Sequence, residues 1–152
     1  MWVKMMIITI ASNGYEDIEP TCKAIALRYG LKFEPIEDNV PKEEGFFNKP
    51  KKDTIYKGML AVWKIKDPDV RIFLKASLEN KIRYLVENKK ITIEDAKKEI
   101  ETKDSEMREY FTNNYGLNVK DYGNYDLVIN IDKINSSGII DVMEKYLNKM
   151  KK

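Results

Sequence analysis

Short apolar runs that suit buried strands alternate along this chain with longer segments whose apolar residues recur at helical spacing. Four strand-like runs occupy residues 5–11, 31–36, 70–76 and 125–131. A chain that alternates strands with helices folds into a sheet of mainly parallel strands, with helices on both faces. We therefore predict an α/β fold in three layers, α/β/α, around a mostly parallel sheet of about four to five strands.

Capping residues place several helix boundaries in the first half of the chain. A helix is predicted from Glu19 to Tyr29, because Gly30 is a natural left-handed C-cap. Residues 40–52, which are rich in proline and lysine, are predicted to form a loop. Asp53 is then predicted to cap a helix that runs to about Ile65.

The second half contains three predicted helices. The first covers residues 78–88, and the second is a long polar helix that ends near Asn114. Thr92 followed by Asp95 resembles a capping box and should begin that long helix. Ser136 or Ser137 is predicted to cap the last, amphipathic helix. Aromatic residues at helical spacing should pack the long helix onto the core rather than stack on a base: Tyr110, Phe111 and Tyr115.

Length and composition indicate one globular domain. The 152 residues are 43% hydrophobic and 34% charged. This size suits a single core, so we treat residues 1–152 as one domain. The net charge of +2 gives no general attraction to nucleic acid or to a membrane. We expect neither as a partner.

Missing residue types exclude whole classes of site. The chain has no histidine, so histidine bases, Ser-His pairs and histidine metal sites are excluded. Its single cysteine, Cys22, cannot form an intrachain disulfide, and a reducing cytoplasm is therefore the expected location. The apolar run at residues 5–11 is too short to span a bilayer and lacks a signal-peptide pattern. The lysine- and glutamate-rich composition is typical of a thermophile.

Three blocks of this sequence resemble the cytidylate kinases, which are nucleoside monophosphate kinases. They are "IITI" with "CKAIALRYGLKF", "VRIFLKASLENKIRYL", and a block from Glu94 to Leu147 that contains "YDLVIN". The resemblance implies a P-loop kinase-like fold, with lid-like helices over residues 78–116 and a shortened monophosphate-binding segment over residues 37–57. It also implies ATP and Mg²⁺ as the cofactors of an active member.

The loop after the first strand departs from the motif G-x-x-x-x-G-K-[ST] of such kinases, which wraps a phosphate, neutralises it and binds magnesium. Ser12 replaces the first glycine and Asp17 the second, while Ile18 and Glu19 replace the lysine and the hydroxyl residue. We predict that this nucleotide-binding loop no longer functions and that the chain has no catalytic residue. The loop equivalent to the motif consists of Ser12, Asn13, Gly14, Tyr15, Glu16, Asp17, Ile18 and Glu19.

Three acids cluster where a phosphate would meet the first helix. A helix N-terminus attracts anions, and Glu16, Asp17 and Glu19 can supply that charge themselves. We predict that these carboxylates cap the helix, at about 1 kcal/mol for each good cap. The alternative is a magnesium or calcium site, but the spacing does not fit a calcium loop, so no metal site is predicted.

Four basic residues remain as candidate phosphate contacts: Lys75, Lys81, Arg83 and Arg108. Lys75 lies at the end of a strand, where ligand sites of α/β folds gather. The lid arginine implied by the resemblance falls on Met107. Arg108 is one residue further on, which rotates its side chain by about 100° around the helix.

Three functional hypotheses follow. The leading one is a cytidylate kinase-like protein that has lost phosphoryl transfer, needs no cofactor and binds a protein or a nucleotide in an altered mode. The first alternative is an active CMP or dCMP kinase that uses ATP and Mg²⁺ with an atypical loop. The second alternative is a subunit of a protein complex or homo-oligomer that makes contact through its last helix.

Overall fold

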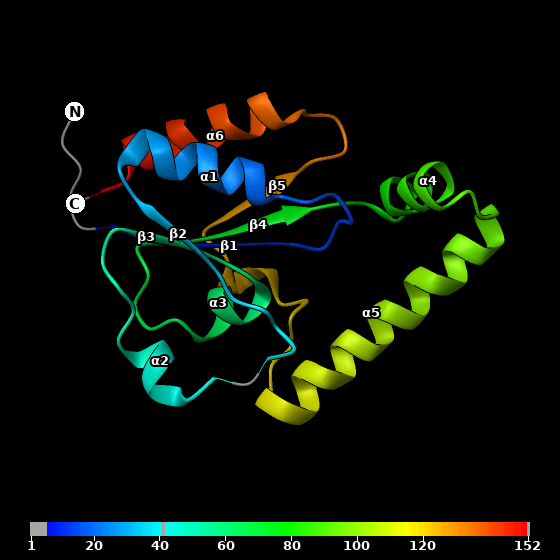
Figure 1. Cartoon of the computed structure of the whole chain (residues 1–152), viewed down its shortest axis with the longest axis horizontal. Helices are drawn as coiled ribbons and strands as arrows, with labels where there is room; N and C mark the ends of the chain where they lie inside the picture. The colour runs from blue at the N-terminus through cyan, green and yellow to red at the C-terminus, as the bar shows by residue number, and fades with distance from the viewer. Residues whose placement is uncertain (1–5, 41, 152) are drawn as a thin grey trace.

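The strands form one sheet at the centre of the molecule, as a computed structural model that describes residues 6–40 and 42–151 shows (Figure 1). The strand order is β2-β3-β1-β4-β5, and all four neighbouring pairs are parallel. This arrangement confirms the predicted α/β class and is consistent with a P-loop kinase-like fold. The strands are β1 (Ile7–Ser12), β2 (Lys32–Pro35), β3 (Thr54–Lys57), β4 (Val70–Lys75) and β5 (Leu127–Asn130).

Helices cover both faces of the sheet and one of its ends (Figure 1). On one face lie α1 (Glu19–Tyr29) and α6 (Ser136–Lys149), and on the other lie α2 (Glu44–Asn48) and α3 (Met59–Lys64). Beyond the carboxyl ends of the strands, α4 (Leu78–Lys89) and α5 (Ile93–Tyr115) form a helical hairpin. Within residues 6–40 and 42–151, no helix is both long enough and apolar enough to cross a membrane.

The central strand β1 is buried on both faces, which explains its unbroken apolar sequence. Ile8 and Ile10 pack in the cluster beneath α1 and α6, whereas Ala11 packs in the cluster on the α3 side. Thr9 is also buried, and its hydroxyl donates to the carbonyl of Val70 (3.3 Å). Side chains of β1 therefore pack into both apolar clusters, one on each face of the sheet.

The long helix α5 is fixed at both ends as the sequence predicts. Thr92 is its N-cap, and the Thr92 hydroxyl accepts the Asp95 N–H at 3.1 Å. Gly116 ends the helix in a left-handed conformation, with φ of 63°. Phe111 is only 1% exposed and packs with the α3 side of the core, and Tyr115 packs against the same cluster. The prediction that aromatics join α5 to the core is confirmed for Phe111 and Tyr115, whereas Tyr110 contacts the rings of these two residues.

The predicted helix from Asp53 to Ile65 is wrong in its first part. Residues 54–57 form β3, which pairs with both β1 and β2, and the helix begins only at Met59. Between the two elements, Gly58 has φ of 141°, a conformation that side chains rarely adopt. The apolar residues at helical spacing belong instead to a buried strand and a short helix that follow one another directly.

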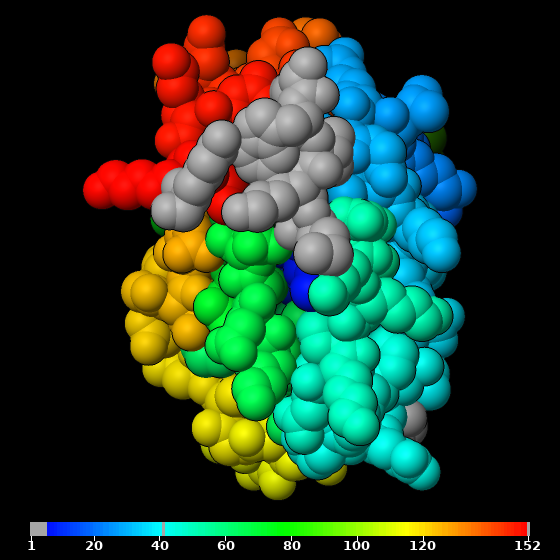
Figure 2. All heavy atoms as spheres, turned by 90° about the vertical axis from the view of Figure 1, so that its left-hand side faces the viewer, coloured from blue at the N-terminus to red at the C-terminus, as the bar shows by residue number. Residues whose placement is uncertain are grey.

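Two further boundaries differ from the predictions. The predicted loop at residues 40–52 contains α2, which lies against the segment leading to β4 at the end of the molecule shown in Figure 2. The Lys66 N–H donates to the Phe47 carbonyl there, at 2.9 Å. The cap of α6 is Asn135 rather than Ser136 or Ser137, because the Asn135 side chain accepts the Gly138 N–H at 2.8 Å.

Candidate functional site

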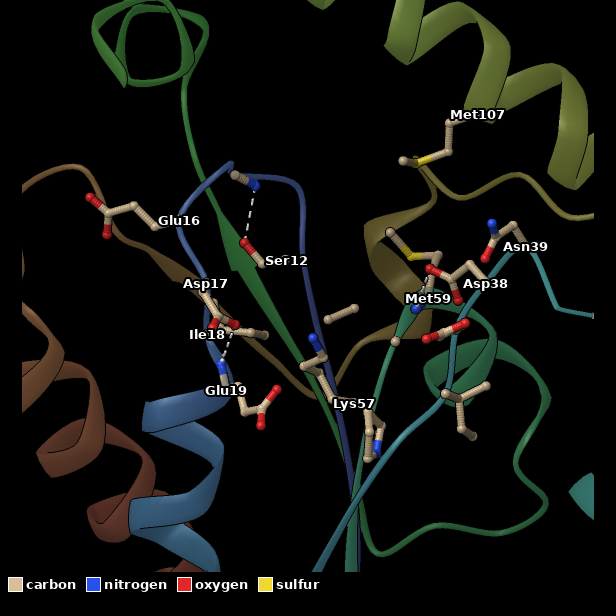
Figure 3. A pocket seen from close by; sticks show the side chains of 16 residues that line it. Ser12, Glu16, Asp17, Ile18, Glu19, Asp38, Asn39, Lys57, Met59 and Met107 are labelled. Carbon is tan, nitrogen blue, oxygen red and sulfur yellow. Dashed lines mark hydrogen bonds between the residues drawn. The ribbon is translucent and has the colours of Figure 1, made fainter. Parts of the chain in front are cut away.

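A pocket of about 480 Å³ opens at the carboxyl ends of the strands (Figure 3). The loop after β1 and the start of α1 line one wall, and the loop after β2 lines the opposite wall. Met107 of α5 faces the pocket from the hairpin. The chain leaves β1 for β2 on one side and later passes to β4 on the other, so this is a topological switch point, where open α/β sheets bind ligands.

The loop between β1 and α1 satisfies several of its own hydrogen-bonding groups. The Asn13 N–H donates to the Leu74 carbonyl (3.3 Å), and the Asn13 side chain exchanges hydrogen bonds with the Ala76 backbone at 2.7 and 3.2 Å. The Gly14 N–H donates to the Ser12 hydroxyl at 3.0 Å. These bonds attach the loop to the end of β4 and use backbone donors that a phosphate-binding loop would direct at its ligand.

The start of α1 has few donors left for an anion. The Glu19 N–H donates to Asp17 Oδ1 at 3.0 Å, which confirms that one of the three acids accepts a bond from the first turn. Pro20 follows and has no N–H to offer. Glu19 itself pairs with Lys23 (2.9 Å), while Figure 3 shows the Glu16 side chain directed away from the helix start. Of the three predicted capping acids, Asp17 accepts an N–H of the first turn, whereas Glu16 and Glu19 make no such bond among the described residues; the N-cap position itself is Ile18, which has no side-chain cap bond.

The opposite wall repeats this pattern at α3. Both oxygens of Asp38 accept backbone N–H groups, from Met59 at 3.1 Å and from Leu60 at 2.8 Å. Burial raises the pKa of the Asp38 carboxyl, while the two N–H bonds and the nearby Lys57 act in the opposite direction. A side chain at Gly58 would place its Cβ 2.4 Å from the Ile36 carbonyl oxygen. The loop after β2 is therefore held tightly against the start of α3.

Negative charge dominates the pocket. Lys57 is the one basic residue among the described residues that line it. The acidic lining residues are Glu16, Asp17, Glu19, Glu37 and Asp38. The residues in place of the motif's lysine and hydroxyl, Ile18 and Glu19, both line the pocket as well. This lining does not fit a magnesium triphosphate, whose charge needs cations and backbone donors.

None of the four candidate phosphate contacts lines this pocket among the described residues. Lys75 lies over the ring of Tyr122, with its Nζ 5.2 Å from the ring centroid. Lys81 is only 6% exposed and pairs with Asp104 across the hairpin at 3.2 Å. Both lysines are therefore used within the fold.

The two candidate arginines also lie elsewhere. Arg108 lines a separate pocket of about 440 Å³ on another face of α5, together with Lys97 and Lys120. Met107 faces the first pocket in its place, as the 100° rotation predicts. Arg83 is close enough to Asp132 to help lower the pKa of that carboxyl, which is lowered mainly by hydrogen bonds from Ser77.

Sequence reasoning missed three charged residues of the pocket: Lys57, Glu37 and Asp38. Lys57 was hidden because residues 54–57 were assigned to a helix, which concealed the end of a strand. Gly58 was the available signal, because a glycine between two apolar segments suggests a break rather than a continuous helix. Asp38 falls in the segment over residues 37–57 that the resemblance implies, and only the fold reveals that its carboxylate accepts the N–H groups of Met59 and Leu60 at the start of α3.

Comparison with known proteins relates part of the chain to a family. The profile of the Cytidylate kinase-like family matches residues 42–133, a region that excludes the loop after β1. The cytidylate kinases of Thermococcus sibiricus and Pyrococcus horikoshii are 27% and 26% identical over 96 residues, which are 63% of this chain. The chain spans about half the length of these two relatives, 50% in each case.

Two other comparisons extend over more of the chain. The cytidylate kinase of Sulfurisphaera tokodaii is 27% identical over 116 residues, which are 76% of this chain and 64% of that protein. The crystal structure of an uncharacterized protein from Eubacterium ventriosum covers 95% of this chain and 99% of its own, with a TM-score of 0.73 and 21% identity. At that identity the structure supports the fold alone.

Proposed function

The chain belongs to the cytidylate kinase-like family, and from that premise we propose that it has kept the kinase scaffold and lost phosphoryl transfer. Its role is then to bind a ligand or a partner without transferring phosphate to it. The retained pocket at the switch point and the retained helical hairpin are the parts of the scaffold that such a role would use.

The charge of the pocket is the observation that supports this proposal. Five carboxylates and one lysine line the place where the fold would hold phosphates. Phosphoryl transfer depends on cations and donors that stabilise negative charge on the moving group. A carboxylate about 4 Å from a phosphate charge opposes it by about 1 kcal/mol in water and about 4 kcal/mol near a protein surface. A triphosphate would meet several of these charges at once.

An active nucleoside monophosphate kinase is the second candidate. The pocket volume of about 480 Å³ is within the usual range for small ligands, and the relatives are named cytidylate kinases. In this case ATP and Mg²⁺ would be the cofactors, and Lys57 would be the cation nearest to the phosphates.

A turnover assay separates the two candidates. Purified protein is incubated with Mg-ATP and CMP, dCMP or UMP, and ADP release is followed by a coupled assay, with an active archaeal cytidylate kinase as the positive control. We expect no turnover above the background without protein. Turnover near 1 s⁻¹, the low end for kinases, would overturn the proposal.

A variant guards against contaminating kinase in the preparation. Lys57→Ala removes the basic residue that lines the pocket, so genuine turnover by this chain should fall when that variant is assayed. Turnover that is equal in both proteins comes from a contaminant and leaves the proposal standing. Calorimetry with Mg-ATP and with CMP then tests for binding without transfer, and we expect no heat of binding for Mg-ATP.

A further inference from the structure

Tyr15 leaves the loop after β1 and packs on the α4–α5 hairpin. Its ring stacks on that of Tyr84 in α4, with a centroid distance of 6.0 Å and an interplanar angle of 16°. Lys103 of α5 places its Nζ 5.2 Å from the Tyr15 ring centroid. One loop side chain therefore contacts both helices of the hairpin, through stacking and a cation–π contact.

The hairpin has its own small core, and Tyr15 is part of it. Leu85, Ala96 and Ile100 are its buried residues, and Tyr15 and Tyr84 are among the partly buried residues packed against them. This cluster is distinct from the two clusters that pack on the sheet. Tyr15 thus joins the central loop of the domain to the apolar core of the hairpin.

Other contacts attach the hairpin near the ends of its chain. At the start of α4, the Ser77 N–H donates to Asp132 at 3.1 Å, and near the end of α5, Phe111 is buried in the core. The middle of the hairpin projects beyond the strand ends (Figure 1). Tyr15 packs against this middle part, so its contact can restrain the position of both helices.

We propose that Tyr15 is a latch that holds the hairpin onto the loop after β1 in the absence of any nucleotide. The loop then positions the lid-like helices through an aromatic contact instead of through a bound phosphate. This proposal rests on the proposed loss of phosphate binding. The residues that follow Tyr15 line the pocket: Glu16, Asp17 and Ile18. A ligand that moves this loop therefore moves the latch, so occupancy of the pocket and the position of the hairpin are coupled.

Hydrogen exchange of the nucleotide-free protein tests the latch. Tyr15→Ala removes the ring, whereas Tyr15→Phe keeps it and serves as the matched control. We expect amides of residues 78–105 to exchange roughly tenfold faster in the alanine variant, and at the wild-type rate in the phenylalanine variant. Amides of β1 and β4 should keep their rates, because the sheet core does not depend on the latch.

The partner side of the contact supplies a second test. Tyr84→Ala should accelerate the exchange of the same amides. In the double variant with Tyr15→Ala, the acceleration of exchange should be smaller than the sum of the two single effects, because both substitutions remove the same contact. Equal rates in the alanine and phenylalanine variants would overturn the proposal. So would an acceleration that extends equally to β1 and β4, because that result means general destabilisation.

This experiment is independent of the kinase assay. No nucleotide is present during exchange, so a failed latch leaves the turnover result unchanged. Conversely, measurable turnover would contradict the proposed loss of catalysis, yet the effect of Tyr15→Ala on exchange would still report whether the loop holds the hairpin.

Discussion

Single aspartates occupy the helix starts at the carboxyl edge of the sheet. Asp17 accepts a backbone N–H at α1, Asp38 accepts two at α3, and Asp132 accepts that of Ser77, the N-cap of α4. Helix starts with unsatisfied N–H groups bind phosphates in many nucleotide-binding folds. In this chain, aspartate carboxylates already accept some of these N–H groups.

Removing the Asp38 carboxylate should destabilise the protein. Asp38→Ala leaves the N–H groups of Met59 and Leu60 at a half-buried helix start without their acceptor. We expect the free energy of unfolding, measured in urea, to fall by about 1–3 kcal/mol. Glu37→Ala, at the neighbouring exposed residue, is the control and should change the free energy of unfolding by less than about 0.5 kcal/mol. Equal effects of the two substitutions would show that the cap is unimportant.

The raised pKa of Asp38 predicts a direction of pH dependence. A group whose pKa is higher in the folded than in the unfolded protein stabilises the fold most when the pH is below its pKa in the unfolded protein, about 3.9 for aspartate. That stabilisation is lost as the pH rises through the pKa of the group in the folded protein. The isosteric variant Asp38→Asn cannot titrate. The stability advantage of the wild type over Asp38→Asn, which is the difference between their free energies of unfolding, should therefore increase as the pH is lowered from about 7 toward 4. A decrease would mean that the N–H bonds outweigh burial.

Elements with strong local caps could be predicted from the sequence. The end of α1 at Gly30 and both ends of α5 depend on residues within the same few positions, and each was placed correctly. The mostly parallel sheet and four of its five strands also followed from the alternation of strand and helix patterns. These features are set by local chemistry, so they can be read without knowledge of the fold.

Elements defined by distant contacts could not be predicted. β3 is only four residues long and is a strand because β1 and β2 flank it. The missed strand concealed Lys57, and the loop after β2 concealed Asp38, whose hydrogen-bond partners lie more than twenty residues away. The acidic side of the pocket after β1 was predicted from the sequence motif, whereas the opposite wall required the fold.

Within the hairpin, the two partners of an ion pair should respond differently to substitution. Lys81 is buried and Asp104 is more exposed. Lys81→Met replaces a buried charge with an apolar chain of similar length, so we expect the unfolding free energy to stay within about 0.5 kcal/mol or to rise. Asp104→Asn leaves the buried ammonium without its carboxylate and should lower it by about 1–2 kcal/mol. Thermal or urea unfolding measures both, and the reverse order would contradict this account of the pair.

At the scale of the whole molecule, the strand order creates a ligand pocket and the sequence determines its charge. The order β2-β3-β1-β4-β5 brings the loops after β1 and β2 to face each other, with α5 above them. Each of the two loops contributes acids, and the hairpin contributes Met107. Under the proposed loss of phosphoryl transfer, three separate parts of the chain therefore depart from a phosphate site, and repairing one of them should not restore nucleotide binding.

Restoring the loop motif alone should fail for that reason. The double substitution Asp17→Gly and Ile18→Lys returns the second glycine and the lysine, yet Glu16, Glu19 and the acids of the opposite wall remain. We expect calorimetry to detect no Mg-ATP binding tighter than about 1 mM. The matched variant Glu16→Gln, Asp17→Asn, Glu19→Gln keeps the loop sequence otherwise intact and removes three charges. If charge is the main obstacle, that variant should bind Mg-ATP better than the motif repair does. Micromolar binding by the double substitution would show instead that the missing lysine and glycine, and not the surrounding carboxylates, exclude the nucleotide.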